Sequence, residues 1–277
     1  MRTYLPALAS ILLLGLSGGA FAQQAEPEKM PFAGGELTIT ENEDFEKILA
    51  FDGKEIARNY QAFFDRTVTV AGIEVALVSM GDGGNACGPA TILVWKPEGE
   101  GIKHDIVGED CGAPPAAATT EQIYFVPYLA PGATGQTVQV WTPSEGVRVA
   151  GLISYTPQPG TGWADLDAGA LDHIVNAFEN AELYQEAQDL LGDELSEVVT
   201  GLFVGGGVEK TPSGIVHASG CTPHACGLAD SFMGIDQPGK KLYFAHQQES
   251  GGPKTWPVLD AWPKDVADVM RKALAPQ

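Results

Sequence analysis

The stretch RTVTVAGIEVALVSMG, residues 66–81, alternates branched and polar side chains on both sides of a central Ala71-Gly72 pair. Successive side chains of a β-strand point to opposite faces of a sheet, so this alternation predicts two strands. The Ala-Gly pair between them favours a tight turn, because glycine adopts the backbone angles that short hairpin turns require. The stretch therefore predicts a β-hairpin in a β-rich module.

Further strand-like runs follow this hairpin, separated by glycine and proline at Pro131-Gly132 and Pro143. Short strands at this spacing are typical of antiparallel sandwiches and barrels. We expect a sandwich-like domain over residues 36–158, preceded by a flexible tail over residues 23–35. The predicted strands are ATILVWKP (90–97), HDIVG (104–108), QIYFVPYL (122–129), TVQVWTP (137–143) and VRVAGLISYTP (147–157).

The pattern changes after a predicted linker, QPGTGWADL at residues 158–166. Apolar residues then recur at helical spacing from Asp167 to Leu191, and a second short helix is expected over Asp193–Leu202. Strand-like runs precede an amphipathic terminal helix, Pro263–Leu274. The fold class is therefore α+β: a β-rich domain followed by an α+β domain at residues 165–277, with an antiparallel sheet and flanking helices. The predicted strands of that sheet are GIVHASGC (214–221), SFMGID (231–236) and KLYFAHQQ (241–248).

The first residues, MRTYLPALASILLLGLSGGAFAQQ, have the pattern of a secretory signal peptide over residues 1–22. Arg2 precedes a leucine-rich run, and Ala20-Phe21-Ala22 supplies small residues at the cleavage-site spacing. A membrane anchor is disfavoured because the apolar run is too short to cross about 30 Å of hydrocarbon. We expect a periplasmic or secreted protein that does not insert into a membrane.

Four cysteines in an exported protein favour disulfides over catalytic thiols. Three pairings are open, and the local one joins Cys87 to Cys111 and Cys221 to Cys226. That pairing places one bond in each half of the chain.

The chain has 36 acidic and 16 basic residues, a formal net charge of −20. Nucleic acids and anionic lipids require clustered lysine and arginine, so neither is an expected partner. The charge favours a basic partner or serves solubility alone. Self-association as a homodimer is left open.

The stretch SGCTPHACG, residues 219–227, admits four hypotheses. A zinc site would use Cys221, Cys226 and His224, completed by His217 or His246. A redox centre would normally have the shorter C-x-x-C spacing. The disulfide ring could be purely structural, since Pro223 also stiffens it. The ring could equally hold His224 outward, ready to enter the cleft of another molecule.

The same stretch resembles the inhibitory loop of the inhibitor of vertebrate lysozyme (Ivy) family, a disulfide-closed C-x-P-H-x-C followed by glycine. Here that pattern is formed by Cys221, Pro223, His224, Cys226 and Gly227, and the resemblance covers roughly residues 165–277. It implies an antiparallel sheet packed with helices, and a loop whose histidine bonds the catalytic carboxylates of lysozyme. Thr222 and Ala225 replace the lysine and aspartate of the family's best-known loop, so the flanking polar contacts differ.

The resemblance thus implies an inhibitor of lysozyme-type muramidases rather than an enzyme, with no cofactor and no metal. Its partner would be a basic lysozyme or a lytic transglycosylase. The alternatives are a non-catalytic periplasmic binding or envelope-assembly protein, and a metal-dependent enzyme using His224. His173 is expected on the surface of the first helix, and His104-Asp105 lacks a nearby nucleophile motif. The predicted inhibitory loop consists of Cys221, Thr222, Pro223, His224, Ala225 and Cys226.

Overall fold

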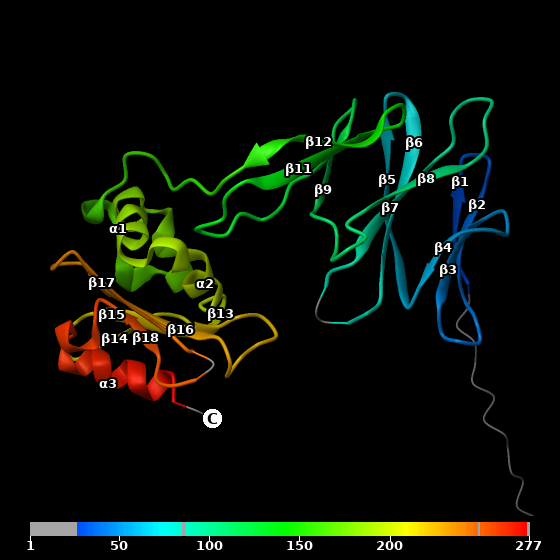
Figure 1. Cartoon of the computed structure of the whole chain (residues 1–277). Helices are drawn as coiled ribbons and strands as arrows, with labels where there is room; N and C mark the ends of the chain where they lie inside the picture. Colours follow the sequence, from blue (N-terminus) through cyan, green and yellow to red (C-terminus); the bar gives the residue numbers. More distant parts are fainter. Residues whose placement is uncertain (1–26, 85–86, 249, 276–277) are drawn as a thin grey trace, which may run out of the picture.

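A computed structural model describes residues 27–84, 87–248 and 250–275 of the 277-residue chain. The predicted signal peptide lies outside the described residues. Figure 1 shows two lobes, a β-rich N-terminal lobe and a smaller C-terminal lobe that carries the helices. The predicted α+β class, with the β-rich part first, is confirmed.

The N-terminal lobe consists of three antiparallel sheets of four strands each, in the order β1-β2-β3-β4, β5-β6-β7-β8 and β12-β11-β10-β9. The first sheet contains β1 (Glu28–Phe32), β2 (Gly35–Glu41), β3 (Lys47–Phe51) and β4 (Lys54–Asn59). The second contains β5 (Gln61–Val70), β6 (Ile73–Gly81), β7 (Ala90–Trp95) and β8 (Lys103–Val107). The third contains β9 (Ala116–Ala118), β10 (Ile123–Phe125), β11 (Gln136–Thr142) and β12 (Gly146–Ile153).

The second sheet is the middle layer, and its central strands β6 and β7 are buried on both faces. On β6, Ala76 and Val78 pack against the first sheet, while Val75 and Leu77 pack against the third. The side chains of β7 alternate between the same two cores. One of them, Trp95, meets Trp141 of β11 edge-on, with 4.9 Å between ring centroids. Double burial explains why β6 and β7 are apolar at consecutive positions.

The predicted hairpin of residues 66–81 is confirmed as β5-β6, with Val70 paired to Ile73 across a two-residue turn. Ala71 and Gly72 have φ of 50° and 78°, the signature of a type I′ turn. Such turns match the right-handed twist of the strands that they join, which fixes the register of the hairpin.

The predicted tail over residues 23–35 is wrong from Glu28 onward, since that segment forms β1 and starts β2. Its exposed Glu28 and Lys29 give it a polar composition, but Phe32 is buried between the first and second sheets. No strand of the first sheet was predicted, because its polar turns and charged residues, such as those at 41–46, obscure the short apolar runs.

Both predicted disulfides are present, Cys87–Cys111 and Cys221–Cys226, with Cα–Cα distances of 4.7 and 4.8 Å. The first joins the segment before β7 to the loop after β8. Gly88 and Gly112 meet beside this bond, where a side chain on Gly112 would collide with the Gly88 backbone.

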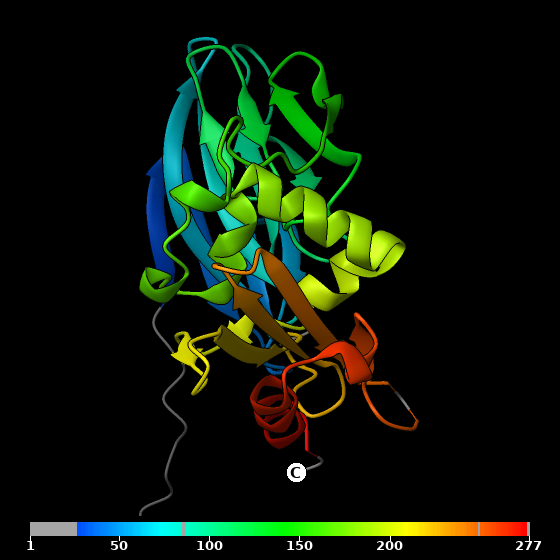
Figure 2. The same ribbon diagram turned by 90° about the vertical axis from the view of Figure 1, so that its left-hand side faces the viewer.

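The C-terminal lobe is an antiparallel sheet in the order β13-β15-β16-β17-β18, with β14 also paired to β15. Figure 2 shows α1 and α2 on one side of this sheet and α3 on the other. The predicted central strands and terminal helix are confirmed. The elements are α1 (Ala181–Leu191), α2 (Leu195–Thr200), β13 (Val204–Gly205), β14 (Glu209–Lys210), β15 (Val216–Cys221), β16 (Asp230–Asp236), β17 (Lys241–His246), β18 (Lys254–Trp256) and α3 (Lys264–Ala273).

The predicted helix over Asp167–Leu191 is too long, because α1 begins only at Ala181. Asn180 caps it, since the Asn180 side-chain oxygen accepts a hydrogen bond from the Leu183 amide at 3.0 Å. Short 3-10 turns precede it and bury the apolar residues whose spacing suggested a continuous helix.

The predicted linker at residues 158–166 is also part of the packed lobe. Trp163 is buried in the helix-side core, and its indole nitrogen donates to Glu186 of α1 at 2.9 Å. No helix within the described ranges is long and apolar enough to cross a membrane.

The two lobes meet through aromatic side chains. Tyr155, just beyond β12, packs on Tyr184 of α1 at 5.1 Å between centroids, and the Gly132 amide donates to the Tyr184 hydroxyl. Burial raises the pKa of Tyr155 to about 12, with smaller contributions from Glu179, Tyr184 and Tyr128. The Tyr155 phenol therefore stays neutral at every physiological pH.

We expect Leu77→Ala to lower the free energy of unfolding by about 2–5 kcal/mol, because it opens a cavity between the second and third sheets. The matched control is Thr67→Ala, an exposed position on neighbouring β5. Urea unfolding of both variants measures the difference. Equal, small losses would contradict the burial of Leu77 between the second and third sheets.

Candidate functional site

The C-T-P-H-A-C loop connects β15 to β16 and projects from one end of the C-terminal sheet (Figure 1). Cys221 is the last residue of β15 and is buried, while Cys226 is exposed within the loop. The disulfide therefore ties the free part of the loop to the end of a central strand.

The tip of the loop is a β-turn with His224 at its third position. The Ala225 amide donates to the Thr222 carbonyl at 2.9 Å, Pro223 takes the second position, and His224 has φ of +64°. This combination defines a type II turn, in which the third position normally holds glycine or asparagine. A histidine in the left-handed region costs on the order of 1 kcal/mol, and such strain concentrates at functional positions.

Pro223 and His224 of the turn are exposed to solvent. The preceding residue, Thr222, makes hydrogen bonds within the loop instead. The Thr222 hydroxyl and the Thr222 amide both donate to the Ala229 carbonyl at 3.1 Å. Thr222 thus braces the loop from within. Leu228 is the other large side chain of the loop and is 76% exposed.

The base of the loop is fixed by Asp230, the first residue of β16. The Asp230 carboxylate accepts from the Gly227 amide at 2.7 Å, and the Asp230 amide donates to the Gln247 side chain at 3.3 Å. The carbonyl of Asp230 also accepts from the Gln247 amide. These contacts extend the support of the loop to the end of β17.

A serine, a histidine and a carboxylate line up beneath the loop. Ser231 is within 2.8 Å of Nδ1 of His246, and Nε2 of His246 lies 3.3 Å from the Glu197 carboxylate on α2. These residue types can form a hydrolase triad, but Ser231 is completely buried, so no substrate carbonyl reaches its hydroxyl. The array instead fastens β16 and β17 to α2, directly below the loop.

Sequence analysis missed this array because Ser231 and His246 meet only through the β16-β17 register, which pairs them directly. The run SFMGID and the run KLYFAHQQ predicted two strands without their pairing. A polar pair at matching positions in adjacent predicted strands was the available signal.

The zinc hypothesis is wrong. Cys221 and Cys226 are disulfide-bonded and cannot act as thiolate ligands. His217 lies on the α3 side of the sheet, stacked on Phe232 at 5.6 Å, whereas His246 faces α2. No group of three metal-ligating side chains occurs among the residues that the structure describes.

His217 is buried, and its surroundings favour the uncharged imidazole. Burial lowers the pKa of His217, and the nearby Glu209 carboxylate opposes that effect only partly. The imidazole packs against the aromatic core below α3 rather than near His224, so the two histidines serve different purposes.

Two further sequence predictions can be placed. His173 is not a surface residue of the first helix: it caps a 3-10 turn, and its Nδ1 accepts from the Val175 amide at 3.2 Å. Its Nε2 is buried and finds no hydrogen-bond partner in the described part of the chain.

Asp105, beside His104, accepts a hydrogen bond from the indole of Trp141 at 2.6 Å and is a structural residue.

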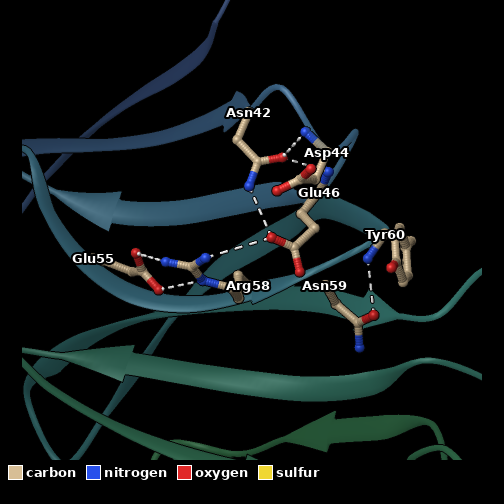
Figure 3. Close-up of polar contacts among 7 residues, drawn as sticks. All are labelled: Asn42, Asp44, Glu46, Glu55, Arg58, Asn59 and Tyr60. Atoms are coloured by element: carbon tan, nitrogen blue, oxygen red, sulfur yellow. Dashed lines mark hydrogen bonds and ion pairs between the residues drawn. The ribbon is translucent and has the colours of Figure 1, made fainter.

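The acidic segment around residues 41–46 is organised by internal contacts, as Figure 3 shows. The Asn42 side chain closes the turn by accepting from the Asp44 and Glu46 amides. Arg58 pairs with Glu46 at 3.4 Å and holds Glu55 with two bonds of 2.7 Å. Hydrogen bonding to Arg58 lowers the pKa of the Glu55 carboxyl. These carboxylates stabilise the end of the first sheet.

Two protein families match separate parts of the chain. The family described as Y4bG N-terminal domain matches residues 33–154, and the family described as inhibitor of vertebrate lysozyme (Ivy) matches residues 182–276. The uncharacterized protein y4bG of Sinorhizobium fredii (strain NBRC 101917 / NGR234) is 26% identical over 231 residues, which cover 83% of this chain and 84% of that protein. The resemblance inferred from the loop is thus confirmed for the C-terminal lobe, and it is a resemblance to inhibitors rather than to enzymes.

We expect the free energy of unfolding to fall with acidification partly because of His217. Its pKa is lower in the folded protein than the usual 6.5, so below that pH the unfolded chain binds the proton first. The His217→Gln variant should show a smaller loss of stability between pH 7.5 and pH 5. Urea unfolding at both pH values tests this, with the exposed His104→Gln as control. An unchanged pH dependence in His217→Gln would refute it.

Proposed function

We propose that this protein, whose C-terminal lobe matches the inhibitor of vertebrate lysozyme (Ivy) family, inhibits lysozyme-type muramidases by inserting the Cys221–Cys226 loop into the active-site cleft. His224 is the contacting residue. The observation that carries the proposal is the placement of His224: an exposed imidazole at the tip of a type II turn, where its backbone conformation is unfavourable.

The loop is suited to this task because it is already ordered before binding. Immobilising a flexible side chain on association costs about 0.5–1.5 kcal/mol, and ordering a loop adds to that cost. Here the disulfide, the turn and the contacts of Asp230 fix the loop in the free protein. More of the contact energy therefore appears as affinity.

The imidazole can meet the carboxylates of a muramidase in two ways. A neutral imidazole donates one hydrogen bond from its protonated nitrogen. An imidazolium donates two and also pairs with the negative charge. Glycosidases of this kind use two carboxylic residues on either side of the scissile bond, so a group held between them blocks both substrate and chemistry.

The expected setting is the periplasm, reached by means of the predicted signal peptide. There the protein would protect peptidoglycan from a host lysozyme or restrain a lytic transglycosylase of the cell itself. Lysozymes are typically strongly basic, and residues after 160 carry 17 acidic against 7 basic side chains. The attraction between a basic lysozyme and this acidic half of the chain favours rapid association of the two proteins.

We expect purified protein to slow the lysis of peptidoglycan-bearing cells by a vertebrate lysozyme, and His224→Gly to weaken that inhibition at least tenfold, or about 1.4 kcal/mol. Glycine suits the left-handed position, so this variant removes the imidazole while relieving the turn. Its thermal stability should equal or exceed that of the wild type.

The matched control is His224→Asn, because asparagine also tolerates positive φ and keeps one polar group at the tip. It should inhibit at an intermediate strength. Equal inhibition by all three proteins would exclude His224 as the contact. If the wild type inhibits neither lysozyme nor a lytic transglycosylase, the proposal fails, and a binding role of the N-terminal lobe becomes the alternative.

The charge argument makes a separate prediction about rates. Raising the ionic strength from about 50 to 300 mM should slow association with lysozyme roughly tenfold and change dissociation little. His224→Gly should keep the same salt dependence and dissociate faster, since it alters the short-range contact only. Stopped-flow or surface-based kinetics can separate the two. Association rates independent of salt would show that charge does not guide this encounter.

A further inference from the structure

The N-terminal lobe reaches the base of the loop through Tyr128. This residue follows β10 and is 75% exposed. The Tyr128 ring meets the ring of Phe203 edge-on, with 6.2 Å between centroids. Phe203 belongs to the C-terminal lobe and directly precedes β13, so Tyr128 touches the segment that flanks the loop.

The segment that contacts Tyr128 is held firmly against the strand that carries the loop. Val204 pairs with Cys221 and Gly205 pairs with Gly220. A side chain on Gly220 would lie 2.6 Å from the Leu202 carbonyl oxygen, and one on Gly205 would lie 2.8 Å from that of Ser219. This close backbone approach leaves little room for the flank to move relative to the loop.

We propose that Tyr128 is a second contact with the same muramidase, so that the N-terminal lobe contributes to the inhibitory surface. This inference rests on the proposed function of the loop. It assigns to the N-terminal lobe the task of extending the interface beyond the single inserted histidine.

The chain geometry keeps the two residues close enough to share one interface. His224 is three residues beyond Cys221, so their Cα atoms are at most about 11 Å apart. Phe203 is adjacent to the residue paired with Cys221, and Tyr128 is in contact with Phe203. A standard interface covers about 800 Å² on each partner, which corresponds to a disc roughly 32 Å across. Tyr128 and His224 both fit inside such a footprint.

The side chains around Tyr128 and Phe203, which we call the flank of the loop, suit contact with a protein partner. Tyrosine is enriched among the residues that dominate binding energy, because it offers a large rigid ring at low conformational cost. The Tyr128 ring is already steadied on one side by Phe203. Val126 precedes Tyr128 by two residues and Val204 follows Phe203, and they are 41% and 49% exposed. The segments that carry the two rings therefore present apolar side chains to solvent. The flank is continuous with the loop, which makes the enzyme that accepts the loop its occupant.

The experiment compares Tyr128→Ala with the wild type in the same lysozyme inhibition assay. We expect the inhibition constant to rise at least fivefold, while Tyr128→Phe stays within twofold because it keeps the ring. The control is Tyr60→Ala, a tyrosine of similar exposure at the end of the first sheet. Thermal unfolding of each variant should match the wild type.

A second measurement needs no variant. Hydrogen exchange of the full-length protein, with and without lysozyme, should show protection over residues 126–135 as well as over the loop. If His224→Gly loses inhibition while Tyr128→Ala does not, and residues 126–135 exchange unchanged, the second contact is refuted and the loop proposal stands. If the wild type neither inhibits nor binds lysozyme, both proposals fall together.

Discussion

Burial of both faces of β6 and β7, the central strands of the second sheet, is the constraint on which the N-terminal lobe depends. Side chains at consecutive positions of β6 and β7 fill two different cores, so neither outer sheet can be removed without exposing apolar surface. The three sheets therefore form one packed body. Its far edge carries Tyr128 and Tyr155 toward the helices of the second lobe.

The C-terminal lobe uses the same principle on a smaller scale. Its sheet is covered by α1 and α2 on one side and by α3 on the other, which leaves the strand ends as the free parts. The loop lies at one of those ends, and the contacts of Asp230, Ser231 and His246 join it to two strands and a helix. Rigidity below the loop allows an unfavourable backbone conformation to persist at its tip.

The sequence patterns predicted the elements that have a strong period, and missed those that do not. Hairpin 66–81 was predictable because its alternation and its Ala-Gly turn agree with each other. Strand β1 was missed because Glu28 and Lys29 make it resemble a tail. Helix α1 was predicted too long, since 3-10 turns bury apolar residues at nearly helical spacing. The Asn180 cap and Glu182 in the first turn were the local signs of its start.

The candidate site shows a similar division. The two cysteines and Pro223 made a stiff, outward-facing loop predictable from local spacing alone. The His224 backbone angle, the internal use of Thr222 and the pairing of Ser231 with His246 depend on register and on residues far along the chain. No local pattern contains that information.

The left-handed backbone at His224 also limits which residues can replace this histidine over time. Glycine, asparagine, aspartate and histidine are the residues that tolerate such a conformation most readily. A mutation at the tip is therefore free to exchange an imidazole for an amide, a carboxylate or a bare backbone, but branched and bulky side chains would first have to remodel the turn. The fold thus restricts the chemistry that selection can sample at the tip of the exposed loop.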